Sequence, residues 1–280
     1  MKAEKVNKIS KEFVVGERDG GLVKINRIKN AGKDKLHLVL DFDRTLTPGR
    51  NAQGQEFTTW QMLHRHLPAS LRIEATRLYE KYRPFEIAGR MTVADAVAWW
   101  TSRLDLDIQS GLKWSDLARE IKENMPARPG AKEIFDVCAR KGIPTIIISA
   151  GLKDVIELWC QKFEIKPTLV LSTNLRFDVK GYVCGWDKDS LIHILNKHEK
   201  GHQELGTIRQ SRPNTILVGD SFDDAAMVEG EDDVLRIFID DGRADDRRAQ
   251  DFHKTVFKTF DLIIPGKSLL PLVKIIKYIK

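Results

Sequence analysis

The chain has 280 residues, of which 42% are hydrophobic and 31% charged, and its formal net charge is +6. This length suffices for one substantial core and a smaller accessory unit, and no apolar stretch approaches the length needed to span a membrane. The charged N-terminus lacks the apolar segment of a secretory signal, and the three cysteines have no metal-type spacing, which indicates reduced thiols: Cys138, Cys160 and Cys184. A cytoplasmic protein is therefore expected. Its mild positive charge does not decide between a nucleic acid and a phosphorylated small molecule as partner.

After a basic lead-in, the first predicted strand covers residues 36–40 and ends at two acids, Asp41 and Asp43. Residues at i and i+2 of an extended chain point to the same side, so both carboxylates could share one site beyond the end of the strand. Two like charges so close together need a compensating cation, and Mg²⁺ suits carboxylate oxygens. The alternative is an ordinary turn after a strand, where Asp and Thr are common.

Residues 48–126 change to helical spacing of apolar residues, as in residues 71–79, 93–100 and 112–117. This pattern predicts an inserted helical cap. Beyond it, strands and helices alternate to the end, which is typical of a parallel sheet covered on both faces. The expected fold is therefore α/β with a Rossmann-like core. The core would consist of residues 1–47 and 127–280, and the cap of residues 48–126.

A second apolar, β-branched run at residues 142–148 ends at Ser149. The Ser149 hydroxyl and the backbone N–H groups that follow, beginning with that of Ala150, could hold a phosphate oxygen at a helix N-terminus. The alternative is that Ser149 only caps the following helix.

A third strand, predicted at residues 214–219, delivers Asp220 as a further metal ligand. Between the second and third strands, Lys188 opens an amphipathic segment and could supply a fixed positive charge, although most such lysines are solvated. The charge-rich stretch 240–248 predicts a loop and a solvated helix start in preference to a second metal site.

In this order the four segments resemble the haloacid dehalogenase superfamily of phosphotransferases. Within it, several stretches look like the cytosolic type III (pyrimidine) 5'-nucleotidases: residues 148–155, 191–198, 219–227, 235–237 and 245–247. The similarity extends from about residue 25 to the C-terminus but is patchy between 48 and 126. Arg44 departs from the apolar residue that the family carries between the acid and Thr45.

The resemblance implies a role for each matching residue. Asp41 would be the nucleophile that attacks phosphorus, and Asp43 the acid that protonates the leaving alcohol and then activates water. Mg²⁺ would be held by Asp41, the backbone carbonyl of Asp43 and Asp220. The remaining core residues would bind phosphate oxygens or support those that do: Ser149, Ala150, Lys188 and, orienting Lys188 or a metal-bound water, Asp224.

By the same resemblance, cap residues would select the substrate. Trp100 would stack on a nucleobase, with Trp60 or Phe57 as the other wall, and Trp99 is a further candidate. The alternative is that these tryptophans form a packed helix face. Ala94 replaces an acid of the family pattern, which suggests a shifted specificity.

The function predicted from the sequence is a magnesium-dependent phosphomonoesterase that releases phosphate from nucleoside 5'-monophosphates through an aspartyl-phosphate. The expected substrates are pyrimidine nucleotides, and a methylated purine nucleotide is an alternative. One alternative is a phosphatase for phosphoserine or a sugar phosphate on the same core. A nucleic-acid-binding protein is another, but such a protein would not need Asp43.

Overall fold

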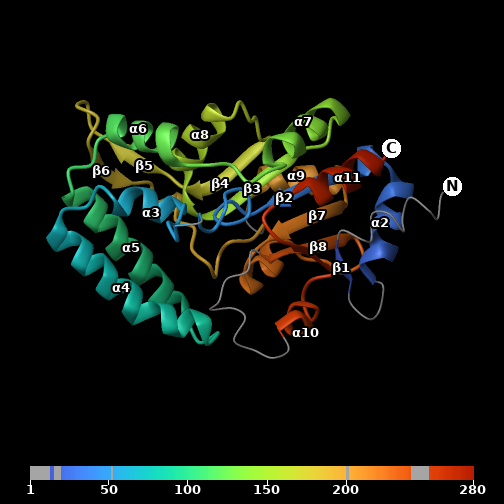
Figure 1. Cartoon of the computed structure of the whole chain (residues 1–280), viewed down its shortest axis with the longest axis horizontal. Helices are drawn as coiled ribbons and strands as arrows, with labels where there is room; N and C mark the ends of the chain where they lie inside the picture. The colour runs from blue at the N-terminus through green and yellow to red at the C-terminus, as the bar shows by residue number, and fades with distance from the viewer. Residues whose placement is uncertain (1–12, 16–19, 52, 200–201, 241–251) are drawn as a thin grey trace.

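A seven-stranded sheet runs through the middle of the protein (Figure 1). The computed structural model describes residues 13–15, 20–51, 53–199, 202–240 and 252–280. The strand order is β1-β9-β8-β7-β2-β3-β4, with β1 antiparallel to β9 and all other neighbours parallel. The strands of this sheet are β1 (Val14–Val15), β2 (Leu36–Leu40), β3 (Thr145–Leu152), β4 (Leu169–Thr173), β7 (Asn214–Gly219), β8 (Val234–Asp240) and β9 (Leu262–Pro265). The predicted α/β fold with a Rossmann-like parallel sheet is confirmed.

Helices cover both faces of the sheet, and a small antiparallel hairpin of β5 (Leu175–Phe177) and β6 (Val183–Trp186) lies beside it (Figure 1). The helices outside the inserted segment are α2 (Gly20–Ala31), α7 (Ala131–Lys141), α8 (Lys153–Lys162), α9 (Gln203–Ser211), α10 (Phe252–Val256) and α11 (Leu270–Tyr278). Short 3₁₀ turns occur at η1 (Lys33–Lys35), η2 (Lys188–Ser190) and η3 (Phe222–Met227). The predicted strands at 36–40 and 214–219 agree with β2 and β7.

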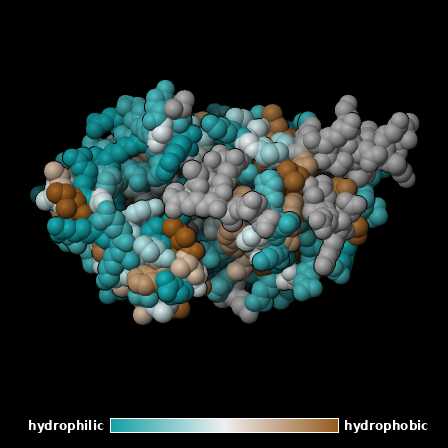
Figure 2. Space-filling view, turned by 60° about the horizontal axis from the view of Figure 1, so that its bottom comes forward, coloured by the Kyte–Doolittle hydropathy of each residue, from teal (hydrophilic) through white to brown (hydrophobic). Residues whose placement is uncertain are grey.

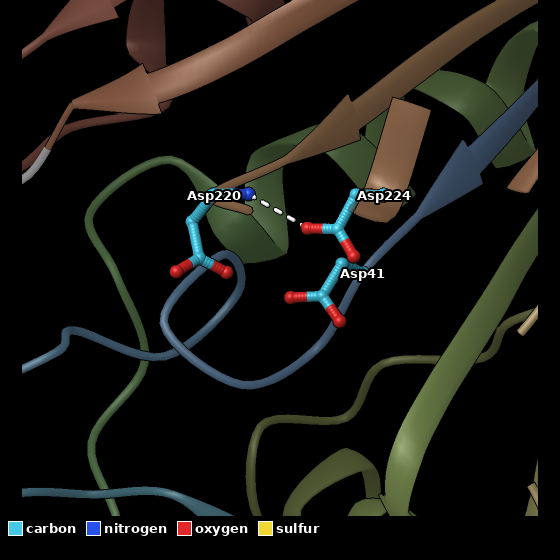
Figure 3. A group of neighbouring side chains, drawn as sticks. All are labelled: Asp41, Asp220 and Asp224. Carbon is cyan, nitrogen blue, oxygen red and sulfur yellow. Dashed lines mark hydrogen bonds between the residues drawn. The ribbon is translucent and has the colours of Figure 1, made fainter. Parts of the chain in front are cut away.

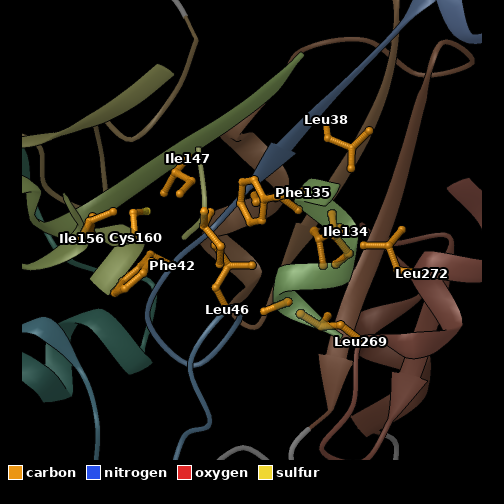
Figure 4. Packing of buried hydrophobic residues seen from close by; sticks show 14 of the residues in the cluster. Leu38, Phe42, Leu46, Ile134, Phe135, Ile147, Ile156, Cys160, Leu269 and Leu272 are labelled. Carbon is orange, nitrogen blue, oxygen red and sulfur yellow. The ribbon is translucent and has the colours of Figure 1, made fainter. Parts of the chain in front are cut away.

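The core is split by the sheet into two layers, because side chains alternate between the faces of a strand. In β2, Leu38 and Leu40 belong to the cluster that packs against α7, α8 and α11, whereas Val39 belongs to the cluster on the other face. Figure 4 shows the first layer, in which Leu38 and Ile147 of the sheet lie near Ile134 and Phe135 of α7. All five residues of β2 are buried, as expected for a central parallel strand.

The segment between β2 and α7 contains four helices, α3 (Thr59–His64), α4 (Ala69–Ile87), α5 (Val93–Gln109) and α6 (Trp114–Asn124). Helices α4 and α5 pack against each other and extend to one side of the sheet (Figure 1). Helix α5 begins with a capping box in which Thr92 and Asp95 satisfy each other's backbone N–H groups. Helix α6 packs on the core helix α8, and the division into a core and a 48–126 cap remains a prediction.

The surface in Figure 2 is mainly hydrophilic, with hydrophobic residues in small separate groups. None of the helices that the structure describes is long and apolar enough to cross a membrane. The basic residues 1–12, the resemblance at 245–247 and most of the charge-rich stretch 240–248 lie outside the described residues.

Candidate active site

Three buried carboxylates meet where β2 and β7 end (Figure 3). Asp41 follows β2 directly, Asp220 follows β7, and Asp224 lies in η3. Each contributes an oxygen to a group whose ligand atoms all lie within 4.8 Å of one another. Because β2 and β7 are parallel neighbours, their carboxyl ends deliver these side chains to the same edge of the sheet.

Asp224 is anchored by backbone groups. Its Oδ2 accepts hydrogen bonds from the N–H groups of Asp220 and Ser221, both at 3.0 Å. A side chain at Gly219 would meet Asp224, because an added Cβ would lie 2.4 Å from its Cβ and its Oδ2. Glycine at the end of β7 therefore allows Asp224 to sit against the strand.

The lysine of the site is Lys197, and the prediction of Lys188 is wrong. Lys188 is exposed in η2, whereas Lys197 is buried with its ammonium between Asp41 Oδ1 and Asp224 Oδ1, the latter at 2.7 Å. Residues 191–196 form no helix but an irregular loop that carries the chain from the surface to the site. Asp224 thus orients Lys197 and not Lys188.

Side chains within this loop hold it in shape. Asn196 Oδ1 accepts from the His193 N–H at 2.6 Å, and Asn196 Nδ2 donates to the Leu191 carbonyl at 2.9 Å. The Ile192 N–H donates to Thr173 Oγ1 at the end of β4, at 3.0 Å. The loop that places Lys197 is therefore tied both to itself and to the sheet.

The electrostatics of the cluster favour a bound cation. Burial raises the pKa of Asp41 well above its usual range; Lys197 opposes the rise, and Asp224 and Asp220 add to it. Burial acts to lower the pKa of Lys197, but Asp224 and Asp41 together raise it above its ordinary value. One lysine does not balance three buried carboxylates, and excess buried charge is costly unless a counter-ion offsets it.

The donor atoms fit Mg²⁺. Asp41 Oδ2 is buried and has no hydrogen-bond partner among the described residues, so it offers an unused lone pair to the cluster. Asp220 lies beside it, and hard carboxylate oxygens are what Mg²⁺ prefers. Asp224 is committed to Lys197 and to two backbone N–H groups, which leaves Asp41 and Asp220 as the side-chain candidates.

Asp43 lies apart from this cluster and is held by the first residue of α3. The Thr59 N–H donates to Asp43 Oδ1 and the Thr59 hydroxyl to Oδ2, each at 2.7 Å. Burial raises the pKa of Asp43 to about 6, although the hydrogen bonds from Thr59 act to lower it. The two acids of Asp41-Phe42-Asp43 thus occupy different environments, as expected when one is a nucleophile and the other a proton donor.

Ser149 lies inside β3 and does not cap the next helix, since the residue preceding α8 is Leu152. Ser149 is buried, and its Oγ accepts a hydrogen bond from the Gly151 N–H at 3.1 Å. The hydroxyl proton is then left to be donated outward. The alternative in which Ser149 is only a helix cap is therefore wrong.

The cap tryptophans do not form the two walls predicted for a base. Trp60 and Trp100 are perpendicular, with ring centroids 6.4 Å apart, so no parallel slot exists between them. Trp99 stacks on Tyr82 of α4 at 5.8 Å, which matches the alternative of a packed helix face. Trp100 is 7% exposed, and both Trp60 and Trp100 donate their indole N–H to the Ala150 carbonyl.

Comparison with known proteins shows the family of the chain. The family model described as pyrimidine 5'-nucleotidase (UMPH-1) matches residues 45–280, which is most of the chain. The chain belongs to the pyrimidine 5'-nucleotidase family. It is accordingly a hydrolase of phosphoric monoesters of the 5'-nucleotidase type.

Curated relatives of this family member include 7-methylguanosine phosphate-specific 5'-nucleotidases. The Homo sapiens protein is 27% identical over 97% of this chain and 93% of its own length. The Drosophila melanogaster protein is 29% identical over 80% of this chain and 69% of its own length. A putative cytosolic 5'-nucleotidase 3 of Caenorhabditis elegans is 24% identical over 88% of this chain and 70% of its own length.

Solved structures support the fold of the family. Cytosolic 5'-nucleotidase IIIB bound to cytidine superposes with a TM-score of 0.82 at 23% identity, covering 99% of this chain and 96% of that one. A phospho-aspartyl intermediate analogue of phosphoserine phosphatase gives a TM-score of 0.57 at 20% identity, covering 89% of this chain and all of that one (100%). The predicted haloacid dehalogenase fold is thereby confirmed.

Two residues that contact Asp41 or Asp43 were not predicted, Lys197 and Thr59. Lys197 lies within the stretch 191–198 that resembles the nucleotidases, so the signal was present but was assigned to the wrong lysine. For Thr59 the sequence offers only a Thr-Thr pair before a helix, in which Thr58 serves as the N-cap. Its contact with Asp43, 16 residues earlier, depends on where α3 lies relative to β2.

Proposed function

We propose that this protein hydrolyses nucleoside 5'-monophosphates with Mg²⁺, through a phosphorylated Asp41. The observation that carries the proposal is the separation of the two acids of one short segment. Asp41 lies in the buried cluster with Lys197, and Asp43 is held apart by Thr59. Such a pair can serve as the nucleophile and the proton donor of phosphate ester hydrolysis.

In the first step, a carboxylate oxygen of Asp41 attacks phosphorus and the bond from phosphorus to the 5'-oxygen breaks. Asp43 gives its proton to the departing oxygen, which leaves as the nucleoside alcohol. In the second step, Asp43 takes a proton from water, and the water oxygen attacks the phosphorus of the acyl phosphate. The bond between Asp41 and phosphorus breaks, inorganic phosphate is released, and both acids return to their starting forms.

Lys197 keeps Asp41 oriented and offsets negative charge as the phosphoryl group arrives. Ser149, whose hydroxyl proton remains to be donated, and the Ala150 N–H would bind non-bridging phosphate oxygens. Mg²⁺ would be held by Asp41, Asp220 and, as predicted from the sequence, the Asp43 carbonyl. It would supply positive charge that lets an anionic nucleophile approach an anionic phosphate.

The base is proposed to be a pyrimidine or 7-methylguanine. The family model is named for pyrimidine nucleotides, and the curated relatives are named for 7-methylguanosine phosphate. An aromatic group of α4 and α5 with one exposed ring, Tyr79, supports a base subsite near the cap: Tyr79, Tyr82 and Trp99. A cationic base over an aromatic face gains roughly 0.5–2 kcal/mol. Asp95 caps α5 through Thr92, so it does not replace the acid absent at Ala94.

The cysteines support placing the protein in a reducing compartment such as the cytosol. Cys138, Cys160 and Cys184 are all free thiols. Burial raises the pKa of both Cys138 and Cys160 to about 12, so neither is a reactive thiolate.

The test is phosphate release from CMP, UMP, 7-methylguanosine monophosphate, nucleoside 3'-monophosphates, sugar phosphates and phosphoserine, each with Mg²⁺ and with chelator. We expect magnesium-dependent cleavage that is selective for 5'-monophosphates. Comparable turnover of sugar phosphates or phosphoserine would contradict the nucleotide assignment but leave the catalytic one. Salt-sensitive retention of an oligonucleotide without any hydrolysis would instead favour the nucleic-acid-binding alternative.

A further inference from the structure

One peptide group of the candidate phosphate-binding segment accepts hydrogen bonds from two helices of the inserted segment. The Ala150 carbonyl accepts the indole N–H of Trp100 at 2.7 Å and that of Trp60 at 3.3 Å. Trp60 belongs to α3 and Trp100 to α5, so two separate helices meet at one oxygen. A carbonyl oxygen has two lone pairs, and the two indoles use both.

The other end of the same peptide is also fixed. The Gly151 N–H donates to Ser149 Oγ at 3.1 Å. The plane of the Ala150–Gly151 peptide is therefore held from the carbonyl side by the tryptophans and from the amide side by the serine that is proposed to bind phosphate. A rotation of this plane would break contacts on both sides.

The α-carbon of Gly151 packs against the residue that holds Asp43. A Cβ at Gly151 would lie 2.2 Å from Thr59 Oγ1, so Thr59 packs directly on the glycine. The same hydroxyl of Thr59 donates to Asp43. The Ala150–Gly151 peptide, Ser149 and the carboxylate of Asp43 thus form one connected unit with the first turn of α3.

We propose that Trp60 and Trp100 are positioning residues, which hold the Ala150–Gly151 peptide and through it the phosphate-binding Ser149. Their indole N–H groups donate to the segment that is proposed to bind phosphate. Loss of these bonds should therefore weaken the binding of the phosphoryl group, which all substrates share. This proposal builds on the proposed phosphatase chemistry, but it is independent of which base the substrate carries.

The test uses Trp60→Phe, Trp100→Phe and the double variant, which keep an aromatic ring and remove the N–H. The readouts are the dissociation constant of inorganic phosphate by calorimetry in Mg²⁺, and kcat/KM for an aryl phosphate and for a nucleotide. Loss of one neutral hydrogen bond corresponds to a change of roughly 2- to 10-fold. We expect phosphate to bind that much more weakly in each single variant, with the larger effect for Trp100 because its bond is shorter.

In the double variant the carbonyl has no indole donor, and the loss is expected to exceed the product of the two single losses. The aryl phosphate and the nucleotide are expected to lose kcat/KM by the same factor. Trp114→Phe in α6, whose ring packs on Phe177, is the matched control and should leave both readouts unchanged. Thermal unfolding midpoints are measured for all variants, so that a loss of phosphate binding can be distinguished from a loss of folding.

Unchanged phosphate binding and unchanged aryl phosphate turnover in the double variant would overturn the proposal, even if nucleotide turnover fell. Absence of phosphate binding by the unaltered protein would overturn it as well. A protein that cleaves aryl phosphate but no nucleotide would refute the proposed substrate, while the phosphate-binding comparison would still decide the role of the tryptophans.

Discussion

At the scale of single residues, the site depends on which carboxylates stay charged and which exchange protons. Asp41 touches Lys197, and its second oxygen is left for a cation. Asp43 is two residues away but is bonded to Thr59 instead. Because the proposed nucleophile and the proposed proton donor each depend on their own contacts, substitution of either acid should affect turnover more than substitution of a surface charge.

Asp41→Asn is expected to abolish turnover, because an amide is a poor nucleophile and the acyl phosphate cannot form. The measurement is phosphate release under saturating substrate, together with detection of a phosphoprotein that hydroxylamine cleaves in acid-quenched samples of the unaltered enzyme. Residual activity above about 1% of the original kcat would contradict covalent catalysis by Asp41.

Lys197→Met is expected to lower kcat by at least roughly 100-fold, because a fixed donor beside the reacting group is lost. The variant should also be less stable by roughly 3–5 kcal/mol, since Asp41 and Asp224 lose their shared cation in a buried site. Lys188→Met is the matched control, and its kcat should remain within 2-fold of the original. Equal effects of both substitutions on kcat would contradict the assignment of Lys197.

At the scale of elements, the candidate site residues lie at the ends of β2, β3 and β7, and the start of α3 holds Asp43. The first residue of α3, Thr59, contributes both its N–H and its hydroxyl to Asp43. Helix α3 thus links the inserted segment to Asp43, the proposed proton donor. Changes in this helix should alter catalysis although α3 supplies no reacting atom.

Thr59→Val removes the hydroxyl but keeps the branched shape and the N–H bond. We expect kcat to fall by roughly 10-fold with little change in KM, because the orientation of Asp43 is weakened while phosphate contacts remain. Thr59→Ser retains the donor and should recover most of the rate. If Thr59→Ser were as slow as Thr59→Val, the lost packing of the methyl group would explain the defect instead.

Strand β2 also contains a buried histidine that makes stability depend on pH. His37 Nδ1 donates to the Arg212 carbonyl at 2.8 Å, and Nε2 lies 3.2 Å from Thr215 Oγ1, which fixes a neutral tautomer. Burial lowers the pKa of His37 to about 4. The unfolded chain, with an ordinary pKa near 6.5, therefore binds the proton first as the pH falls.

The stabilising contribution of neutral His37 is complete above pH 6.5 and is lost as the pH falls toward 4. Between pH 7 and pH 5 the folded protein should lose roughly 2 kcal/mol through this group, since one pKa unit corresponds to about 1.4 kcal/mol. Urea unfolding at both pH values, compared with His37→Gln, measures this loss. An equal pH dependence in both proteins would refute the role of His37.

At the scale of the whole molecule, a metal ion bound in the cluster of three buried acids would couple its binding to folding. Asp41 and Asp220 come from strands that are neighbours only after the sheet has formed. The unfolded chain cannot present them together, so Mg²⁺ should bind the folded form preferentially. Such a ligand raises the thermal midpoint.

Mg²⁺ at about 100 times its dissociation constant is expected to stabilise the protein by about 2.7 kcal/mol, which corresponds to a midpoint increase of roughly 5–10 °C. The measurement is thermal unfolding with Mg²⁺ and with chelator. Asp220→Asn should abolish most of the increase. A midpoint that does not respond to Mg²⁺ in the unaltered protein would argue against the metal site.

The strands and the acids at their ends could be predicted from the sequence, because both signals are local. A buried parallel strand is a short apolar run, and an acid directly after it lies at the carboxyl edge of the sheet. These two signals were enough to predict the positions of Asp41, Asp43 and Asp220. The helical spacing of apolar residues at 71–79 and 93–100 likewise predicted α4 and α5.

Only the tertiary structure decided which other residues meet these acids. Lys188 and Lys197 are residues of the same type nine positions apart, and the path of the loop at 191–196 determines which of them is buried. The indoles of Trp60 and Trp100 are directed to the Ala150 carbonyl because α3 and α5 converge there. Local patterns specify what a strand delivers to the site, whereas contacts between distant segments arise from the packing of whole elements, which short stretches of sequence do not encode.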